Sequence, residues 1–209
     1  MIQNNQFESL AFSMGTFVWY FAVVEDRIDP LKLGRVRIRI MGYHTADKAD
    51  IATGKLLWAY PMQPITSAAM SGIGDAPVGV VEGTWVFGFF RDGHAAHDPI
   101  VMGTMGGIPQ SKNPAEGFND PAGVYPRDEM MGEPDTNRLA RNEKISDTIV
   151  QDKKDTEDKG VPVSLGGGSW DEPANPYAAE YPFNHVKETE SGHIQEFDDT
   201  EGSERVHTY

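Results

Sequence analysis

The stretch FVWYFAVVEDRIDPLKLGRVRIRIMGYH, residues 17–44, carries the strongest β-strand pattern in the chain. Its first part, Phe17–Glu25, is almost wholly apolar and aromatic, which predicts a strand that is buried on both faces. Its second part, Gly34–Met41, alternates with a period of two, as a strand does when one face lies on a core. Two sets of side chains alternate there: Val36, Ile38 and Ile40 on the core side, and Arg35, Arg37 and Arg39 on the other. Asp29 and Pro30 favour a turn between the strands, so the stretch predicts an antiparallel hairpin.

Further strand patterns follow the hairpin at short spacing. They cover Leu56–Pro61, Thr84–Phe90 and Ile100–Thr104, and Gly88 favours a bend within the second of them. Together with the hairpin, these segments give five short strands that are separated by turns. The fold class that we predict is therefore all-β, with a small five-stranded closed barrel of the OB-fold type rather than a sandwich.

Composition excludes several classes of protein. The chain has 209 residues, no cysteine and 39% hydrophobic residues, so it has no disulfides or thiol chemistry, and a helical bundle is disfavoured. The first residues, MIQNNQFESLAFSMG, lack the basic and apolar regions of a signal peptide. No apolar run approaches the roughly 20 residues that cross a bilayer. We expect a soluble product that is made in a cytoplasm.

The net charge of −14 is unevenly distributed. Residues 1–110 carry 8 Lys and Arg against 10 Asp and Glu, whereas residues 111–209 carry 10 against 22. The front half is therefore nearly neutral and the back half is strongly acidic. Such a back half repels nucleic acid and anionic membrane, because both carry negative charge themselves.

Composition also divides the chain into four segments. Residues 1–14 form a polar arm, residues 15–107 form the barrel, and residues 176–209 form a second β region. Residues 108–175 are predicted to be an extended linker that is rich in Pro, Gly and acidic residues and has little helix. This linker holds too few large apolar residues for a core of its own.

Three short β-like pieces make up the second β region. They are His185–Thr189, His193–Phe197 and Glu204–Thr208, and polar turns join them. Each piece has one or two large apolar side chains, too few to offset the entropy of ordering one copy, roughly 1–2 kcal/mol per residue. We therefore expect these strands to wrap around those of identical chains.

Several long motifs, in the same order along the chain, resemble one protein family. VVEDRIDPLKLGRVRIRIMGYH (23–44), QPITSAAMSGIG (63–74) and VMGTMGGIP (101–109) resemble the N-terminal OB-fold of the central spike, or cell-puncturing, protein of T-even-like contractile-tailed phages. FNDPAGVYPR (118–127) is similar to the start of that family's linker. Residues 175–209 are similar to the entry to its trimeric β-helix, which type VI secretion spike proteins share. The resemblance covers most of the chain.

The resemblance implies a structural protein of the tail baseplate of a virion, assembled in the host cytoplasm. It implies a homotrimer whose barrel docks on a hub protein ring and whose residues 176–209 begin an intertwined β-helix or β-prism. This needle would carry a tip protein, contact the host outer membrane transiently and pierce it when the tail contracts. The expected core of the trimer consists of Val186, Ile194, Phe197 and Val206.

One departure from the family concerns enzymatic activity. In T-even phages a lysozyme domain lies between the OB-fold and the needle. Here the segment between Gly107 and Asn175 is too short and too polar for a globular enzyme core. We predict a spike that is not an enzyme, and a spike that hydrolyses peptidoglycan is the alternative.

The arginine stripe of the hairpin is a candidate partner interface, formed by Arg35, Arg37 and Arg39. Basic grooves on OB-folds bind single-stranded nucleic acid, which is a further alternative function. However, carboxylates stand on the neighbouring strand and turn, ready to pair with the stripe: Glu25, Asp26 and Asp29. Internal ion pairs are therefore favoured, docking of a protein partner comes second, and no nucleic-acid binding is expected.

A second candidate interface is a small, uncharged loop that contains Ser67, Ala68, Ala69, Met70 and Ser71. Small side chains there suit close backbone packing, either against a partner or within a tight loop. The loop is not a phosphate-binding loop, because it lacks the Lys-Ser/Thr ending of that motif.

Other patterns fall short of a catalytic or metal site. His94 and His97 have a chelating spacing but no third ligand. In a homotrimer the three copies of His185, His193 or His207 could meet on the threefold axis and bind an ion, but packing at the surface or interface is favoured. A general acid–base pair needs one carboxyl group with a raised pKa beside one with a low pKa. No pair of carboxylates in the sequence has the apolar surroundings that would raise one pKa in this way. We expect no catalytic residue, no metal and no cofactor.

Overall fold

The computed structural model describes residues 17–69, 73–108, 111–134, 137–141, 160–162, 169–171 and 178–208. The chain divides into two compact units, Met1–Asp135 and Thr136–Tyr209. The arm predicted at residues 1–14 and much of the predicted linker lie outside the described residues.

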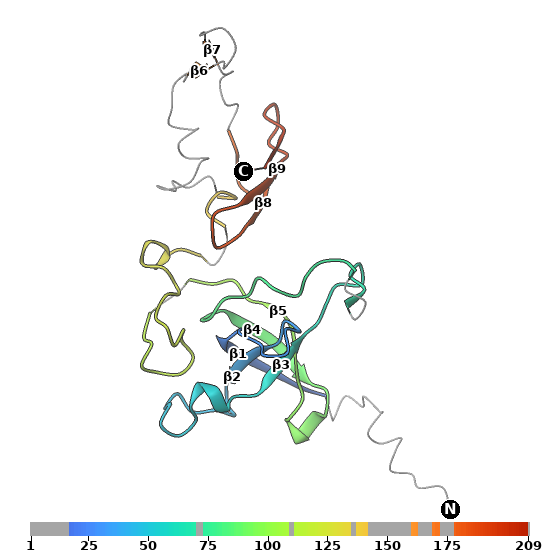
Figure 1. Cartoon of the computed structure of the whole chain (residues 1–209), viewed down its shortest axis with the longest axis vertical. Helices are drawn as coiled ribbons and strands as arrows, with labels where there is room; N and C mark the ends of the chain where they lie inside the picture. Colours follow the sequence, from blue (N-terminus) through green and yellow to red (C-terminus); the bar gives the residue numbers. More distant parts are fainter. Residues whose placement is uncertain are drawn as a thin grey trace, which may run out of the picture. The chain divides into compact units, whose positions relative to one another are not determined.

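The first unit is a closed barrel with the strand order β1-β2-β3-β5-β4 (Figure 1). Its strands are β1 (Val18–Asp26), β2 (Val36–Ile40), β3 (Trp58–Pro61), β4 (Trp85–Phe90) and β5 (Pro99–Thr104). Neighbouring strands run antiparallel, except that β3 and β5 run parallel. Single 3-10 turns interrupt the connections: η1 (Thr53–Lys55), η3 (Gly93–Ala95) and η4 (Asp128–Met130). The closed arrangement confirms the predicted five-stranded barrel.

β1 and β2 form the predicted hairpin. The register shifts between Val24 and Asp26, so a bulge bends the hairpin near its turn. Asp29 closes the turn, because its carboxylate accepts hydrogen bonds from the backbone N–H groups of Leu31 and Leu33 at 3.0 and 2.9 Å. The predicted role of Asp29 in the turn is thereby confirmed.

Alternate residues of the strands fill the barrel interior. The buried apolar side chains are Tyr20, Ala22, Val24, Val36, Ile38, Ile40, Ala59, Val86, Phe90 and Val101. Three of them belong to β2, which confirms the alternation predicted there. Burial of each larger side chain stabilises the barrel by about 1.5–3 kcal/mol.

β1 is buried on both faces only in its second half, which corrects the prediction for the whole strand. Trp19 and Phe21 point outward, and each is 49% exposed. The aromatic rings of β4 lie beside these two side chains on the same outer surface, but they do not cover them from solvent. The outer face of the second half is closed by a later segment, whose Phe118 N–H donates to Glu25 at 2.8 Å.

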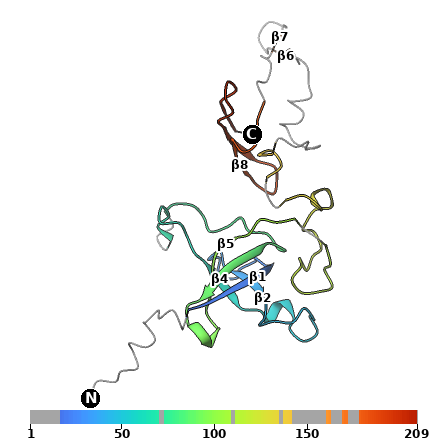
Figure 2. The same cartoon turned by 180° about the vertical axis from the view of Figure 1, so that it is seen from behind.

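The register between β4 and β5 shifts between Phe87 and Gly88, at the glycine where the sequence predicts a bend. A Cβ atom at Gly88 would lie 2.0 Å from the carbonyl oxygen of Ile100 and 2.6 Å from the hydroxyl of Tyr20. The Tyr20 hydroxyl donates a 2.8 Å hydrogen bond to the same carbonyl. β4 pairs with β1 on one side and with β5 on the other (Figure 2). Glycine is therefore required at this point, since a Cβ atom would meet the backbone of β5 and the side chain of β1.

Part of the predicted linker packs against the barrel. The N–H of Gly117 donates to the carbonyl of Ala46 at 2.7 Å. Asp120 is buried, and its carboxylate accepts hydrogen bonds from three backbone N–H groups of the turn that follows it. The first compact unit accordingly extends to Asp135, beyond the boundary predicted at residue 107.

The described residues of the second unit form two sheets. β6 (Gly160–Pro162) pairs with β7 (Ser169–Asp171) in a hairpin that the sequence did not predict. β8 (Asn184–Glu188), β9 (Ile194–Asp198) and β10 (Arg205–Thr208) form an antiparallel sheet in the order β10-β9-β8. Three strands were predicted here, within a residue or two of these bounds. The predicted winding with identical chains stays a prediction.

Candidate partner interfaces

The predicted interface arginines are all engaged within the barrel unit. Each one pairs with a carboxylate of β1 or its turn: Arg35 with Asp29 at 2.7 Å, Arg37 with Asp26 at 3.4 Å, and Arg39 with Glu25 at 2.6 Å. The internal ion pairs that the sequence favoured are therefore confirmed. Arg39 is fully buried within the chain and cannot contact a partner, which corrects its place in the predicted interface.

Glu25 is the centre of a buried polar network. Its carboxylate accepts two hydrogen bonds from Arg39, one from the Thr53 hydroxyl at 2.7 Å and one from the Phe118 N–H at 2.8 Å. Burial by itself would raise the pKa of Glu25, but these hydrogen bonds outweigh it and hold the pKa below its usual value. Arg39 also donates to two carbonyls of the β2–β3 loop. The network thus ties β1, β2, this loop and the later segment together.

Arg35 and Arg37 lie over aromatic rings on the outer face of β2 and β3. The Arg37 guanidinium is 4.4 Å from the ring centroid of Trp58, and that of Arg35 is 5.4 Å from the centroids of Trp58 and Tyr60. Nucleic acid binds this face in many OB-folds. Here both arginines are neutralised by their partners, and the hydrogen bonds from Arg35 hold the pKa of Asp29 far below its usual range. The face therefore offers no net positive charge to phosphate.

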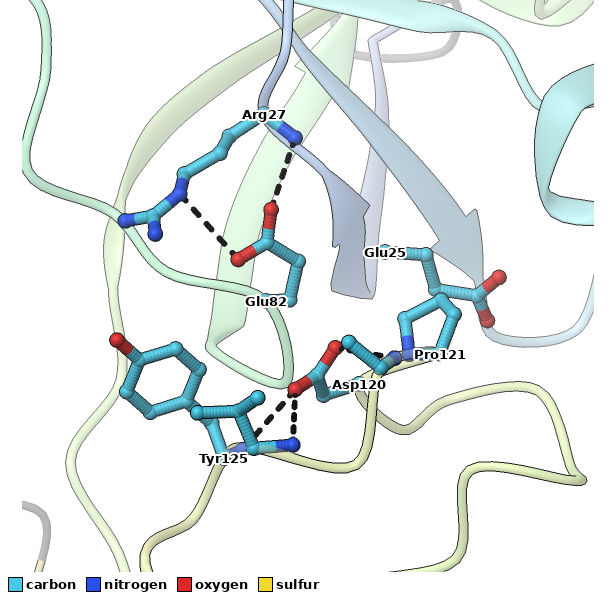
Figure 3. A pocket seen from close by; sticks show the side chains of 8 residues that line it. Glu25, Arg27, Glu82, Asp120, Pro121 and Tyr125 are labelled. Atoms are coloured by element: carbon cyan, nitrogen blue, oxygen red, sulfur yellow. Dashed lines mark hydrogen bonds and ion pairs between the residues drawn. The ribbon is translucent and has the colours of Figure 1, made fainter.

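A cavity of about 320 Å³ lies between the end of β1 and residues 120–125 (Figure 3). Arg27 and Glu82 form an ion pair at 3.3 Å on one side of it. On the other side, Asp120 holds the backbone N–H groups of Val124 and Tyr125 at 2.7 and 3.0 Å. These charged groups maintain the fold, which disfavours the cavity as a catalytic site.

The small loop of the sequence analysis packs on itself. The N–H of Ala68 donates to the carbonyl of Ile73 at 2.8 Å. A Cβ atom at Gly74 would lie 2.6 Å from the Cα of Ser67, so small residues allow the loop to close. Of the predicted contact residues, Ser67, Ala68 and Ala69 are described, whereas Met70 and Ser71 lie outside the described residues.

Exposed aliphatic side chains occur on two loops that touch each other, β1–β2 and β3–β4. The loops meet where a Cβ atom at Gly34 would lie 2.4 Å from the carbonyl oxygen of Pro77. We call this surface the loop end, and its exposed residues are Ile28, Leu31, Leu33, Ile65, Ile73 and Val78. Single exposed aliphatic residues are common and need no explanation, whereas a contiguous apolar patch marks an interaction site. The loop end is a candidate for such a patch because its two loops touch.

Aromatic rings form another exposed apolar surface, on the outer side of β1 and β4. The register places Trp19 opposite Phe89 and Phe21 opposite Phe87, and Trp85 is the first residue of β4. Trp19 stacks on Phe87 with ring centroids 4.8 Å apart and planes 8° apart. We call these five residues the aromatic face. Sequence reasoning missed it, because a continuous apolar run does not show which rings face outward.

The predicted trimer-core residues lie on opposite faces of the β8–β10 sheet. Phe197 stands opposite Val206, and they are 44% and 65% exposed. Ile194 is buried on the other face, where Val186 stands opposite Glu196. Phe197 and Val206 are therefore the members of the set that one chain leaves most exposed.

The buried face of this sheet is polar. Asp198 accepts hydrogen bonds from the Thr200 hydroxyl at 2.6 Å and from Arg205 at 3.0 Å. Burial would raise the pKa of Asp198, but these two donors lower it below its usual value. Glu196 is also buried, accepts a 3.0 Å hydrogen bond from Asn184 and lies 3.6 Å from Arg205. Polar pairing therefore holds this sheet, in keeping with its few apolar residues.

The part of the chain that the structure describes contains no group of three His, Asp or Glu side chains arranged to hold a metal ion. It also contains no helix that is long and apolar enough to cross a membrane. His94 lies in η3 and His97 follows it in the β4–β5 connection.

Comparison with known proteins bears on this barrel directly. Residues 42–176 match the family described as the Gp5 N-terminal OB domain. The match covers more than half of the chain and includes β3, β4, β5 and the segment that packs on the barrel. The chain belongs to the Gp5 N-terminal OB domain family. This confirms the family that the motifs resemble.

Two relatives illustrate how far the similarity of this Gp5-family chain extends. Protein Gp5 of Vibrio phage KVP40 is 48% identical over 224 residues, which cover 92% of this chain and 53% of the relative. Pre-baseplate central spike protein Gp5 of Enterobacteria phage T4 is 49% identical over 144 residues, which cover 64% of this chain and 24% of the relative. The chain thus spans about half the length of one relative and a quarter of the other.

Proposed function

We propose that this chain is a structural protein of a phage tail baseplate, a homotrimeric central spike that pierces the host outer membrane on tail contraction. The observation that carries the proposal is the 48% identity to Gp5 of Vibrio phage KVP40 over 92% of the chain, which reaches into both compact units. The relative from phage T4 is itself named a pre-baseplate central spike protein.

The loop end is the surface that we assign to docking on a baseplate hub. Its exposed aliphatic residues belong to two loops that touch at Gly34 and Pro77, and the neighbouring Ser67 and Ala68 have small side chains that would allow a partner to approach closely. The needle would transmit force mechanically, because strands wound with identical chains have their edges paired and cannot peel away singly. Phe197 and Val206 supply apolar contacts for that winding.

We infer a non-enzymatic role for the chain itself. The charged groups around its described cavity are engaged in ion pairs and backbone hydrogen bonds, which supports this view. Loss of turbidity from purified peptidoglycan on addition of the chain would favour the hydrolase alternative. A salt-dependent gel shift with single-stranded DNA would favour the nucleic-acid alternative.

A chimera tests the proposed function. The part of Gp5 in Vibrio phage KVP40 that matches this chain is replaced by the chain, and baseplates are scored by electron microscopy and by plaque formation. We expect baseplates that contain the spike and form plaques. A chain that is folded and soluble but absent from the baseplates would overturn the proposal. Ile65→Glu combined with Ile73→Glu should reduce incorporation, whereas Tyr181→Glu, an exposed site in the second unit, should not.

A further inference from the structure

We propose that the N-terminal arm of this chain adds a strand to the barrel, with residues 10–14 pairing along the edge of the first half of β1. Residues 15 and 16 would form the turn, so that the added strand runs antiparallel to residues 17–21. The arm lies outside the described residues, whereas the edge on which it would pair is described. This inference concerns a single chain and does not depend on the proposed homotrimer.

The first half of β1 has β4 on one side and, in the part of the chain that the structure describes, no strand on the other. β4 pairs with β1 from Val18 to Val23, but β2 pairs with it only from Ala22 onward. The otherwise closed barrel therefore has an edge along Val18–Tyr20. Such an edge presents backbone groups that can bond to a further strand.

Backbone hydrogen bonds further along β1 fix which residues face this edge. On the side of β4, the N–H of Val24 donates to the carbonyl of Thr84 at 3.0 Å. On the side of β2, the carbonyl of Phe21 accepts from the N–H of Met41 at 2.9 Å. Successive residues of a strand direct their backbone groups to opposite sides, so Trp19 shares the side of Phe21. The N–H and carbonyl of Trp19 therefore point to the edge.

The arm has the sequence pattern of a strand with one apolar face. Its large apolar side chains recur at every second position, as Leu10, Phe12 and Met14, and small residues stand between them. Glu8 is the only charged side chain in residues 1–16. Pairing of residues 10–14 therefore removes no charged side chain from water, which would be costly.

The turn sets the register of the added strand. A two-residue hairpin loop of type II′ has glycine at its first position, and Gly15 begins such a loop at positions 15 and 16. With this loop, Met14 stands opposite Phe17, and Phe12 stands opposite Trp19. The pair that flanks the loop is hydrogen-bonded, and so is every second pair after it. Phe12 would thus bond to Trp19, the residue whose backbone groups face the edge.

The same register places apolar side chains together on the outer surface. Opposite residues of an antiparallel pair lie on one side of the sheet, so Phe12 would lie beside Trp19. The Trp19 ring stacks on Phe87 at 4.8 Å and is 49% exposed, and Phe17 meets it at 4.3 Å. A shift of the register by one residue would instead place the small residues of the arm there.

Tethering selects the arm over a strand from another molecule. A two-residue loop joins residues 10–14 to the edge, and short connections give effective concentrations of the order of millimolar. A second copy or a partner strand would have to compete with this at its own concentration. The length also fits, because the edge ends where Met41 bonds to Phe21, which stands opposite Leu10.

Hydrogen exchange at the Trp19 amide tests the pairing in the full chain. The pairing gives this N–H an acceptor in the carbonyl of Phe12, which slows exchange. Gly15→Pro prevents the turn, because its first position needs a positive φ that proline cannot adopt. We expect exchange at Trp19 to become at least about 10-fold faster in Gly15→Pro. Ser9→Pro, the same replacement outside the pairing, should leave the rate unchanged.

The Val24 amide is the internal control, since its bond to Thr84 belongs to the described barrel. We expect its exchange rate to be the same in the wild type and in Gly15→Pro. Equal rates at the Trp19 amide in these two proteins would overturn the inference. Protection of the Trp19 amide that disappears on dilution would also overturn it, because a strand of the same chain is present at every concentration.

A pair of introduced thiols shows whether the strand comes from the same chain. The chain has no cysteine, so Phe12→Cys with Trp19→Cys introduces a single pair, whose Cα atoms would lie about 5.5 Å apart. On mild oxidation we expect a disulfide within one chain, formed at a rate that does not depend on concentration. Ala11→Cys with Trp19→Cys, which is displaced by one residue, should form it at least about 10-fold more slowly.

The thiol pair also decides the question if Gly15→Pro disturbs the barrel at Val24. Equal rates for the two thiol pairs, or disulfides that join two chains, would overturn the inference. None of these results bears on the proposed spike function, because a trimer can form with or without the added strand. Failure of the chimera would likewise leave the pairing of the arm untouched.

Discussion

Glu25 and Arg39 are charged residues that lie fully inside the wall of the barrel unit. Burying an ion costs several kcal/mol, and a pair recovers this only when its geometry is good and its remaining hydrogen-bonding groups are satisfied. Both conditions hold here, because the pair is bidentate and Thr53 and Phe118 also donate to the Glu25 carboxylate. The pair therefore fixes the later segment against β1 and does not form an exposed interface.

Removal of one member of this pair should destabilise the fold strongly. Glu25→Gln keeps the shape but leaves the Arg39 charge buried without a counter-charge, so we expect the free energy of unfolding to fall by about 3–5 kcal/mol. Asp26→Asn, which removes the more exposed partner of Arg37, should cost less than about 1 kcal/mol. Urea unfolding measures both. A loss below 1 kcal/mol for Glu25→Gln would contradict the network described above.

The pH dependence of stability follows from lowered carboxyl pKa values. Hydrogen bonds from Arg35 lower the pKa of Asp29, and the network lowers that of Glu25, relative to their values in the unfolded chain. These groups stabilise the fold fully above their unfolded pKa values, about 4, and the stability is lost as the pH falls toward the folded values. We expect the urea concentration at the unfolding midpoint to decrease as the pH is lowered below about 4. In the Asp29→Asn variant this decrease should be less steep. Parallel curves for the two proteins would refute this assignment.

At the scale of the strands, Gly88 in β4 is required because the backbones of β4 and β5 approach each other closely there. An added Cβ atom would meet the β5 backbone at 2.0 Å, and a backbone cannot yield as a flexible side chain does. Gly88→Ala should therefore lower the free energy of unfolding by at least about 2 kcal/mol, as overpacking does. Gly103→Ala in β5 is the matched control, since its Cβ atom meets nothing within 4 Å. Equal melting temperatures for the two variants would be inconsistent with the strand packing.

The attachment of residues 111–134 to the barrel can be tested at Gly117. A Cβ atom there would lie 2.3 Å from Nε of Arg39, so Gly117→Ala should displace the segment from the barrel. We expect hydrogen exchange at the Phe118 amide to become at least about 10-fold faster, because its bond to Glu25 protects it in the native state. Gly106→Ala, with open space around its Cβ atom, should leave the exchange rate unchanged.

Local patterns predicted much of this fold. The period of two in β2 identified its core side chains, and carboxylates on the neighbouring strand and turn identified the partners of the arginines. The hydrogen bond from Phe118 to Glu25 spans 93 positions, and no local pattern reports it. The aromatic face was likewise hidden, since the exposure of Trp19 depends on which layers cover β1 and not on its own sequence.

Charge organises the whole molecule. The back half of the sequence carries 22 acidic against 10 basic residues, and much of that acidity sits in the unit that contains β8–β10. In the proposed homotrimer, identical chains would therefore associate through apolar or internally paired surfaces. The aromatic face and the exposed pair Phe197 and Val206 are such surfaces, one in each unit.

The molar mass in solution tests the central claim, that this chain works as a homotrimeric spike. Sedimentation equilibrium of the wild-type chain at micromolar concentrations measures it without labels or partners. We expect a species of three times the 23.1 kDa chain mass, which dissociates on dilution. A single species of 23.1 kDa at every concentration would contradict the claim.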